Sequence, residues 1–541
     1  MSDIVGNSTL RSVWDDLAAR RGSRTFLEYF DQQGASCTYT YREFNELVNQ
    51  AANLFLELGV KARECVALHL HSSPEFLMCL FGLAKIGAIA VPIGIHQKAE
   101  ECRYVFERCG IEKVVTEPCF RACYGEGAAL CPAGLVVVAG RGEGVEGGAV
   151  GGVSDGCREV EPGAAAREAL REGDVDFAAG CERQVRALVE RRPLSSGDLC
   201  EVLFTNGTTS CPKGVEITHA NMVFSGIYGA WQFSLGADDR LLTTMPACHS
   251  NFQMSALTPV LAAGATLVFV QKYSARRFWR QVREHRATVI QMVAMIARTL
   301  MLQPHDAAER DHRVRLVQYY LNVTNEEKEE FERRFGVSLM NSYGLTESIG
   351  WALTDPPSGE RRWPSVGRPG LGYVVDIVDD DGRELPAGEV GEIRIGGERG
   401  RTLMRGYFGD PKATARAFDA QGRLCTGDKG YRDEDGWFFF VDRKCNMLKR
   451  AGENISASEV EAVLEDHPAV REAAVIGVPD PIWDQAVKAF VALTPGATAT
   501  PDDLKAYCDG RLADFKVPTI YEFVDALPRT SMGKVAKKLL K

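Results

Sequence analysis

The chain has 541 residues, of which 45% are hydrophobic and 25% are charged, so it has the composition of a folded globular protein too long for one ordinary core. Its formal net charge of -10 at pH 7 argues against a general nucleic-acid-binding protein. The 16 cysteines form no C-x-x-C pair, which argues against a zinc module and favours reduced, mostly buried thiols in a cytoplasmic protein.

The N-terminal segment carries acidic residues early and no long apolar run, so we expect no secretory signal. Residues 76–95 are apolar enough to suggest a membrane span, but Lys85 and Gly87 interrupt the run. We interpret this stretch as a buried helix at 74–86, a turn, and a buried strand at 88–92.

The remaining N-terminal elements follow the same alternation of helix and strand. Helically spaced apolar residues predict a helix over 41–59 that stops at Gly59, and residues 66–70 form a short apolar strand. The rhythm returns from Leu199 to about Ile395. This alternation is typical of βα units around a mostly parallel sheet.

Residues 123–197 differ in composition, because Gly, Ala and Glu dominate and the apolar periodicity fades. The short apolar run at 135–139 is the exception. We predict a surface region that is partly loop, with weak helices at 164–172 and 181–191.

Residues 374–408 alternate short apolar runs with Gly-containing turns, and residues 458–541 read as helix, strand, strand and helix. A boundary near Asp442 separates the two parts. We therefore predict an α/β fold with a large N-terminal domain over 1–441, made of βα-layered sheets plus a small β-barrel-like subdomain. A small α+β domain follows over 442–541.

The strongest chemical signal is the segment 203–219, where an apolar strand leads into a loop of hydroxyl residues and glycines. Such a loop lets backbone N–H groups approach phosphate oxygens, and a lysine adds positive charge. Pro212 stands where a Walker A loop requires glycine, so the loop is of another type. A polar surface loop is the alternative. The candidate phosphate-binding residues are Thr205, Asn206, Gly207, Thr208, Thr209 and Lys213.

This loop resembles the phosphate loop of the acyl-adenylate-forming enzymes, which include acyl-CoA synthetases, luciferases and peptide-synthetase adenylation domains. Asn206 and Ser210 stand where that pattern has serine and glycine, and serine restricts the backbone more than glycine does. Further segments resemble other motifs of the family in the same order along the chain. These segments are 341–347, 426–428, 442–444, 452–455 and 528–534.

The resemblance implies that the segment 341–347 binds the nucleotide and a metal ion. Tyr343 and Gly344 belong to its adenine-binding part, in which the tyrosine lies along the base. Thr346 binds the α-phosphate, and Glu347 helps to hold Mg²⁺, a hard cation that prefers carboxylate oxygens.

The resemblance also implies roles for residues that come later in the chain. Asp428 resembles the aspartate that accepts both ribose hydroxyls, although a turn residue is the alternative for it alone. Arg443 resembles the ribose-binding arginine, and Asp442 the hinge about which a mobile C-terminal domain turns. Lys534 resembles the catalytic lysine. The loop that enters the site for the second half-reaction corresponds to Gly452, Glu453 and Asn454.

One branch of the family, the crotonobetaine/carnitine–CoA ligases, is most similar in the segments 245–249, 271–279, 320–322 and 445–450. Its substrates carry a quaternary ammonium, which aromatic faces or a carboxylate can bind. Asn251 stands where that branch has an acidic residue. Core packing is the alternative for the aromatics, and a neutral packing role is the alternative for the histidine. The acyl-pocket candidates are His249, Tyr228, Trp231, Asn251, Phe252 and Trp351.

We therefore predict an acid–thiol ligase that forms an acyl-adenylate from ATP, releases pyrophosphate and passes the acyl group to coenzyme A, with Mg²⁺ as activating metal. The expected acid is carnitine, crotonobetaine or γ-butyrobetaine. A short- or medium-chain acyl- or aryl-CoA ligase and a non-catalytic nucleotide-binding protein are the alternatives, and a carrier-protein thiol could replace coenzyme A. We expect no nucleic acid partner and no transmembrane segment, and the oligomeric state is left open, a homodimer included.

Overall fold

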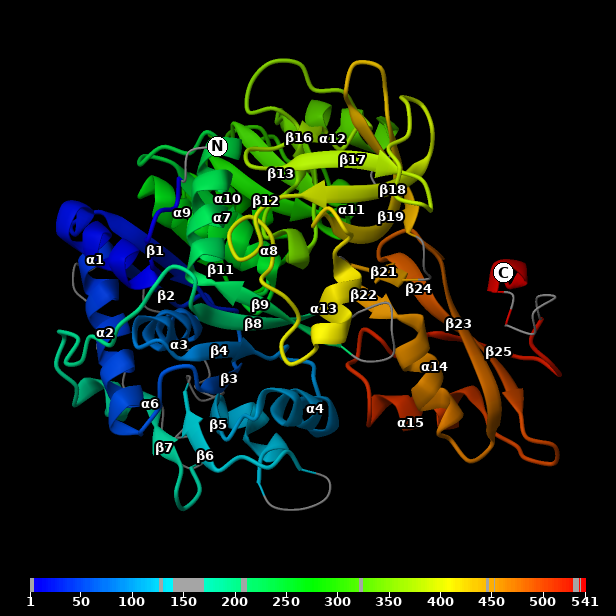
Figure 1. Cartoon of the computed structure of the whole chain (residues 1–541), viewed down its shortest axis with the longest axis horizontal. Helices are drawn as coiled ribbons and strands as arrows, with labels where there is room; N and C mark the ends of the chain where they lie inside the picture. The colour runs from blue at the N-terminus through cyan, green and yellow to red at the C-terminus, as the bar shows by residue number, and fades with distance from the viewer. Residues whose placement is uncertain are drawn as a thin grey trace.

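The computed structural model describes residues 4–125, 130–139, 170–205, 212–320, 325–443, 447–451, 453–528, 535 and 537–541. A large N-terminal body is followed by a smaller C-terminal unit, drawn in orange and red in Figure 1. The body contains two mostly parallel sheets with helices packed against them and one antiparallel sheet. The predicted α/β fold class is confirmed.

The first large sheet has the strand order β7-β6-β5-β3-β4-β8-β9, and its pairs are parallel except β8 with β9. Its central strands are fully buried, as expected for a parallel sheet with covered faces. The predicted strands at 66–70 and 88–92 are confirmed. The strands are β3 (Cys65–His69), β4 (Ile89–Pro92), β5 (Lys113–Thr116), β6 (Leu135–Val138), β7 (Val175–Asp176), β8 (Leu199–Thr205) and β9 (Lys213–Thr218).

The second large sheet has the order β16-β15-β14-β13-β12-β10-β11-β1-β2, with parallel strands in its centre and antiparallel pairs at both edges. Its strands are β1 (Thr25–Phe30), β2 (Ser36–Thr40), β10 (Arg240–Thr243), β11 (Thr266–Val270), β12 (Val289–Val293), β13 (Leu316–Tyr320), β14 (Leu339–Tyr343), β15 (Leu353–Thr354) and β16 (Arg368–Pro369).

The helices begin where the sequence supplies caps. The hydroxyl of Thr40 accepts from the N–H of Glu43 at the start of α2, and Ser73 caps α3 just before Pro74. Gly59 adopts φ 72° just beyond α2, the left-handed conformation that ends a helix at glycine. The helices are α1 (Leu10–Arg21), α2 (Tyr41–Glu57), α3 (Pro74–Lys85), α4 (Ala99–Cys109), α6 (Phe177–Glu182), α7 (His219–Gln232), α8 (Ser250–Phe252), α9 (Thr258–Ala263), α10 (Phe278–Glu284), α11 (Ala294–Met301), α12 (Asn325–Phe335) and α13 (Pro411–Ala417).

A four-stranded antiparallel sheet completes the N-terminal body, in the order β17-β18-β19-β20. Gly382 and Gly388 have φ values of 82° and 86° in the connection between the first two strands, as the predicted turns require. The strands are β17 (Val374–Val378), β18 (Gly391–Gly396), β19 (Leu424–Arg432) and β20 (Phe438–Arg443).

The C-terminal unit has its own sheet, in the order β22-β21-β24-β23 with β25 beside β24, and its own apolar core around Val460 and Leu464. The predicted helix, strand, strand and helix are all present. The elements are β21 (Met447–Arg450), β22 (Glu453–Ser456), α14 (Ala457–Glu465), β23 (Val470–Asp480), β24 (Asp484–Leu493), α15 (Pro501–Asp509) and β25 (Ile520–Phe523).

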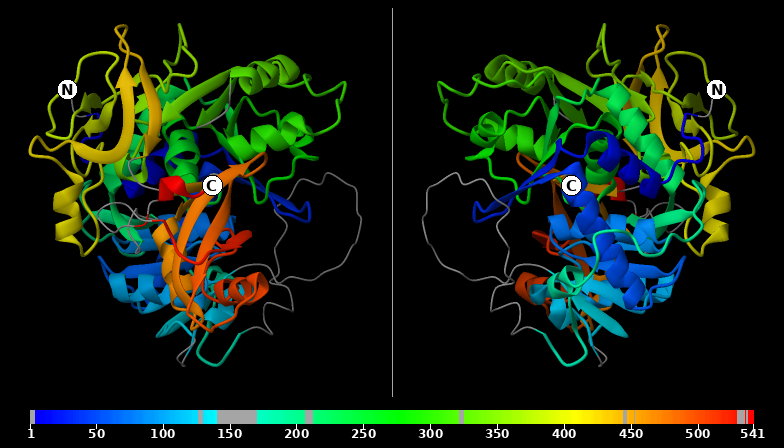
Figure 2. Two further views of the ribbon diagram at one scale, coloured as in Figure 1. Left: turned by 90° about the vertical axis from the view of Figure 1, so that its right-hand side faces the viewer. Right: turned by 90° about the vertical axis from the view of Figure 1, so that its left-hand side faces the viewer.

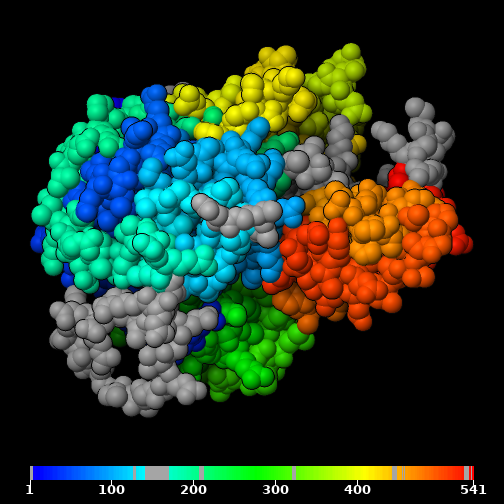
Figure 3. Space-filling view, turned by 90° about the horizontal axis from the view of Figure 1, so that it is seen from below, coloured from blue at the N-terminus to red at the C-terminus, as the bar shows by residue number. Residues whose placement is uncertain are grey.

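The C-terminal unit packs against the N-terminal body, as Figures 2 and 3 show from the side and from below. Lys516 is almost fully buried and its Nζ lies 2.9 Å from Glu101 on α4 and 2.7 Å from Glu459 on α14. A second ion pair joins Arg298 on α11 to Asp484 on β24 at 2.5 Å. These charged contacts link the two parts of the chain.

The structure bears on two expectations from the sequence, that no segment spans a membrane and that the cysteines are reduced thiols. No helix of the described residues has the length and apolar character that crossing a membrane needs. The apolar run at 76–95 is instead the buried helix α3 followed by β4. All 13 described cysteines are free thiols, and Cys119 is the single exposed one among them.

The predicted helix at 181–191 is wrong, because α6 ends at Glu182 and the residues after it are irregular. Their backbone groups bond to side chains of α2 instead. Asn53 donates to the carbonyls of Val185 and Ala187 at 2.9 and 2.8 Å and accepts from the N–H of Val189 at 3.0 Å. The predicted helix at 164–172 falls mostly outside the described residues, and residues 170–172 are not helical.

We expect Asn53→Ala to lower the free energy of unfolding by about 1–3 kcal/mol, because it leaves buried backbone groups without partners. Thermal unfolding monitored by circular dichroism measures the change. Glu46→Ala is the matched control, because Glu46 also reaches this segment from α2 but through an exposed ion pair with Arg186. Equal losses in both variants would contradict the assignment.

Candidate active site

The predicted phosphate loop joins two paired strands of the first sheet. Thr205 at the end of β8 and Lys213 at the start of β9 are antiparallel partners, so they flank the loop on its two sides. The hydroxyl of Tyr104 on α4 donates to the carbonyl of Pro212 at 2.9 Å, which ties the end of the loop to a helix. The other loop candidates, Asn206, Gly207, Thr208 and Thr209, lie outside the described residues.

A segment that the sequence analysis missed brings the lysine of this loop to the predicted metal ligand. Residues 405–408 run beside β9, and the hydroxyl of Tyr407 donates to Glu347 Oε1 at 3.0 Å. Lys213 Nζ lies 5.0 Å from the centre of the Tyr407 ring, a cation–π contact. Burial and the charge of Glu347 raise the pKa of Tyr407, so its hydroxyl stays protonated and can donate.

The predicted adenine and ribose residues also meet. The hydroxyl of Tyr343, at the end of β14, donates to Asp428 Oδ2 on β19 at 2.7 Å, and both residues are buried. Arg443 is the antiparallel strand partner of Asp428, so the two ribose candidates stand opposite each other on β20 and β19. Asp442 is the next residue back on β20. For Asp442 and Arg443 the structure describes the backbone only.

A ladder of hydrogen bonds fixes the backbone that presents Asp428. Its N–H donates to the hydroxyl of Thr426 at 3.0 Å, which in turn donates to the carbonyl of Ile393 at 2.6 Å. The N–H of Gly427 donates to Glu392 Oε1 at 3.1 Å. Gly427 has φ 69°, a conformation that glycine adopts without strain.

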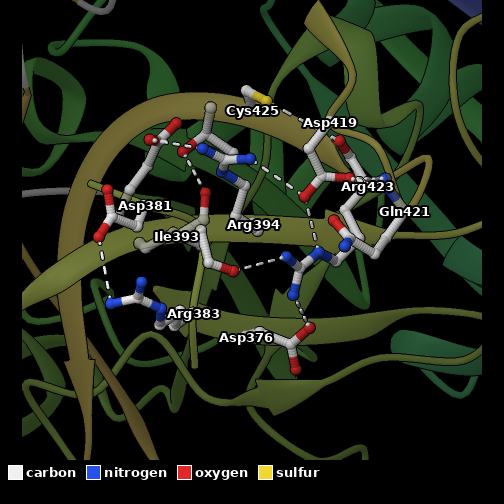
Figure 4. A network of polar contacts seen from close by, with 12 residues as sticks. Asp376, Asp381, Arg383, Ile393, Arg394, Asp419, Gln421, Arg423 and Cys425 are labelled. Carbon is white, nitrogen blue, oxygen red and sulfur yellow. Dashed lines mark hydrogen bonds and ion pairs between the residues drawn. The ribbon is translucent and has the colours of Figure 1, made fainter. Parts of the chain in front are cut away.

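Glu392 is in turn one end of a chain of charges that crosses the antiparallel sheet. Figure 4 labels the other members of this chain, which are Arg394, Asp419, Arg423 and Asp376. Arg394 lies between Glu392 and Asp419, at 3.2 and 3.0 Å. Arg423 lies between Asp419 and Asp376, at 2.8 and 2.9 Å. Because each charge is paired and mostly buried, the chain holds Glu392 rigidly under the segment that carries Asp428.

Three of the predicted acyl-pocket aromatics lie close together. Tyr228 on α7 donates a short hydrogen bond to the carbonyl of Trp351, and its ring lies 5.4 Å from that of Trp231, which is 38% exposed. Gly370 has to be glycine here, because a Cβ would fall 2.0 Å from the Tyr228 hydroxyl. Phe252 instead packs on Phe269 of the core, with 4.5 Å between ring centres.

Tyr373 is a further aromatic residue of this region that the sequence analysis missed. Its hydroxyl donates to the carbonyl of Ser348 at 2.6 Å and accepts from the N–H of Gly350 at 3.0 Å. Its ring lies 5.7 Å from that of Tyr228. It therefore fixes the turn that follows Glu347.

The loop of residues 247–253 carries His249 and contacts both the nucleotide segment and the C-terminal unit. The hydroxyl of Ser250 lies 3.0 Å from that of Thr346, a predicted α-phosphate ligand. His249 Nε2 lies 2.8 Å from Glu453 Oε1 on β22. Asn251 uses its backbone carbonyl to accept from Gln291 at 2.8 Å.

Burial opposes a charge on His249, but the carboxylate of Glu453 more than compensates and raises the pKa of the imidazole. Glu453 therefore reaches the predicted acyl site from the C-terminal unit. The remaining predicted residues in this part of the chain are Lys534 and Gly452, which lie outside the described residues, and Asn454, whose side chain does.

The chain matches known domain families and full-length relatives. Residues 14–408 match the AMP-binding enzyme family, and residues 459–534 match the AMP-binding enzyme C-terminal domain. The chain is 44% identical over 543 residues to the crotonobetaine/carnitine–CoA ligase of Citrobacter koseri and 44% identical over 541 residues to that of Salmonella agona, with 100% of both chains covered in each case.

Two solved structures share the fold. The o-succinylbenzoate CoA synthetase of Bacillus subtilis is similar with a TM-score of 0.79, 24% identity and 98% of each chain covered. The amide bond synthetase McbA of Marinactinospora thermotolerans is similar with a TM-score of 0.81 and 25% identity, covering 98% of this chain and 99% of its own.

We expect Arg394→Met to raise the KM for ATP about tenfold, or about 1.4 kcal/mol, because Glu392 loses the charge that holds it under Gly427. Steady-state kinetics with varied ATP measures the effect. Arg383→Met is the control, since Arg383 lies in the connection between β17 and β18 and forms an exposed ion pair with Asp381. A KM for ATP that stays the same in Arg394→Met would show that the charge chain does not position the ribose segment.

We expect Glu453→Gln to lower the pKa of His249, because the carboxylate is what raises it. The sign follows from linkage: the pair adds stability below the ordinary histidine pKa of about 6.5 and loses it as the pH rises through the raised value. NMR titration of labelled imidazole carbons, assigned with His249→Gln, measures the shift. The same His249 pKa in both proteins would contradict the pairing.

Proposed function

Since the chain belongs to the AMP-binding enzyme family, we propose that it is an ATP-dependent ligase that converts a carboxylic acid to an acyl-adenylate and then to a coenzyme A thioester. The resemblance found in the sequence is thereby confirmed. The acid–coenzyme A ligase class follows from the similarity to named ligases over the full length of the chain.

The observation that carries the proposal is the meeting of motif residues that are far apart in the chain. Tyr343 donates a hydrogen bond to Asp428. Tyr407 donates a hydrogen bond to Glu347 and makes a cation–π contact with Lys213. Such a set has a place for each part of ATP: adenine and ribose at the first pair, and phosphates at the second.

The chemistry explains why cations are needed. A carboxylate is a poor electrophile, and its oxygen must attack the α-phosphorus of ATP, so negative charge accumulates as pyrophosphate leaves. In our proposal Lys213 and the loop after β8 hold the β- and γ-phosphates, Thr346 contacts the α-phosphate, and Lys534 meets the α-phosphate and carboxylate oxygens. Catalysis is then positioning and charge stabilisation.

The residues present fit a magnesium ion. Glu347 supplies the carboxylate that such a hard cation prefers, and the hydroxyl of Tyr407 orients it by hydrogen bonding to one oxygen. When bound, the ion neutralises charge on the triphosphate. The role of the protein is to hold Glu347 aimed at the phosphate side of the site.

For the acid, we propose a small carboxylate with a quaternary ammonium group, such as carnitine, crotonobetaine or γ-butyrobetaine. The names of the relatives that are 44% identical support this class. The cluster of Tyr228, Trp231 and Trp351 supports it too, because aromatic faces attract a cation that cannot donate hydrogen bonds. Asn251 supplies no counter-charge, so selectivity would depend on these rings.

For the second half-reaction, we propose that the loop of Gly452, Glu453 and Asn454 helps to admit coenzyme A. The contact of Glu453 with His249 at 2.8 Å supports this role. Asp442 is the proposed hinge, at the end of the last strand before the C-terminal sheet begins at Met447. A cytoplasmic location agrees with the free thiols, and a homodimer stays a prediction.

The decisive test of the function mixes the protein with ATP, Mg²⁺ and a panel of acids, and measures pyrophosphate with and without coenzyme A. We expect turnover with betaine acids and a thioester only when coenzyme A is present. Turnover with simple fatty or aromatic acids but not betaines would favour the alternative acyl- or aryl-CoA ligase. No turnover with any acid would favour a nucleotide-binding protein.

In the same assay, we expect Lys534→Ala to slow pyrophosphate release about 10²–10³-fold, the usual cost of losing one preorganised charge. Lys537→Ala is the control, because the nearby Lys537 forms an ion pair with Glu461 within the C-terminal unit. If Lys534→Ala released pyrophosphate as fast as the unmodified protein, the catalytic assignment of this lysine would be wrong.

A further inference from the structure

Glu201 is an acidic residue buried in the middle of β8, the strand that leads into the phosphate loop. Ala90 on β4 and Ile217 on β9 are its strand partners, so the sheet continues on both sides of it. No cationic side chain among the described residues pairs with Glu201. A lone ionised carboxylate in such a place costs several kcal/mol, so an uncharged state is favoured.

Gln253 is the direct partner of Glu201. It begins the single π-helical turn Gln253–Leu257, and its Nε2 donates to Glu201 Oε1 at 2.8 Å and to the carbonyl of Ala247 at 3.0 Å. Two buried atoms are left over, Glu201 Oε2 and Gln253 Oε1, and both lack a donor among the described groups. A proton on Glu201 is the donor that this pair lacks.

The electrostatic surroundings favour that proton. Burial raises the pKa of Glu201 to about 8, although the hydrogen bond from Gln253 opposes the shift. The titratable groups that face it are the thiols of Cys200 and Cys248, whose own pKa values are raised by burial, so both are neutral. Within the described part of the chain, no cation therefore compensates a negative charge on this carboxyl.

The pair of Glu201 and Gln253 holds the loop between Ala247 and Gln253 in place. Gln253 binds the carbonyl at the start of the loop with its side chain and the carbonyl of His249 with its own N–H at 3.2 Å. The hydroxyl of Ser72 also holds the start of the loop, because it accepts from the N–H of Ala247 at 3.0 Å. One glutamine thus holds the backbone at two points, the carbonyl of Ala247 and the carbonyl of His249.

We propose that Glu201 is a positioning residue that pairs with Gln253 as a neutral acid and amide, and so fixes the loop that aims His249 at the acyl group. The inference rests on the proposed function, in which His249 borders the reacting carboxylate. Glu201 itself does not touch substrate. Its effect on the reaction passes through Gln253 and the backbone of the loop.

The test compares Glu201→Gln with Glu201→Leu. A glutamine keeps a neutral group of the same length that can both donate to and accept from Gln253, whereas leucine removes both bonds. At pH 7 we expect Glu201→Gln to keep kcat and both KM values within about twofold. We expect Glu201→Leu to raise the KM for the acid about tenfold or more, with the KM for ATP changed far less.

A pH series separates positioning from simple stability. Because the pKa of Glu201 is raised in the folded protein, the stability it contributes is full below its ordinary value of about 4.3 and is lost as the pH rises through about 8. The melting temperature should therefore fall between pH 6 and 9 more steeply in the unmodified protein than in Glu201→Gln. The KM for the acid should also rise above pH 8 in the unmodified protein and stay level in Glu201→Gln.

Two results would overturn the inference. If Glu201→Gln lost as much activity as Glu201→Leu, the carboxyl would act as an ion and not as a neutral acid. If neither variant changed the KM for the acid, Glu201 would not position the His249 loop. Should Glu201→Leu fail to fold, Gln253→Met removes the same contact from the other side. His249→Ala separates the two proposals. If His249→Ala has the same activity as the unmodified protein, the acyl-site assignment is wrong. If His249→Ala loses activity but Gln253→Met does not, only the role of Glu201 is wrong.

Discussion

The carboxyl ends of parallel strands are the constraint on which this site depends. Thr205 ends β8, Thr243 ends β10 and Tyr343 ends β14, and each strand leads into a loop that carries site residues. Thr243 and Tyr343 lie at the carboxyl edge of the second large sheet and Thr205 at that of the first, and such edges are where ligands of open α/β sheets bind. Strand direction therefore places the His249 loop and the nucleotide segment at one edge, and the contacts of Tyr407 with Glu347 and Lys213 join the phosphate loop of the other sheet to them.

Buried polar groups then hold those loops in place. Gln232 on α7 donates to the hydroxyls of Ser342 and Thr354 at 2.8 and 2.7 Å, just below Tyr343. Glu201 with Gln253, and Arg394 with Glu392, do the same for the His249 loop and the segment that carries Asp428. A buried polar group with its partners in place costs little, but each partner that moves leaves an unpaired group, so such networks allow few alternative geometries.

The sequence predicted the elements whose signal is local. The spacing of apolar residues and the glycine at position 59 were sufficient for α2, and the motifs that predict a nucleotide site contain Tyr343 and Asp428, which are in contact in the structure. The segment 181–191 was mispredicted because its backbone is held by Asn53, a partner far away in sequence, and not by its own hydrogen bonds. Tyr407 was missed for a related reason: an aromatic residue in an irregular segment has no periodicity, and only the pairing of 405–408 with β9 brings it to Glu347.

The contact between His249 and Glu453 joins residues far apart in the chain, so local sequence patterns could not predict it. The contact also has a consequence for the reaction. One end of the His249 loop is held by groups of the N-terminal body, whereas its tip meets a carboxylate that belongs to the C-terminal unit. Any displacement of that unit removes the partner of His249 while the buried anchors stay in place. The imidazole would then change its charge state without a change in the loop, because the raised pKa depends on Glu453 whereas the loop backbone depends on Gln253. A rigid loop with an exchangeable partner at its tip can serve two successive steps at one site, since the geometry of the loop persists while the charge beside it changes.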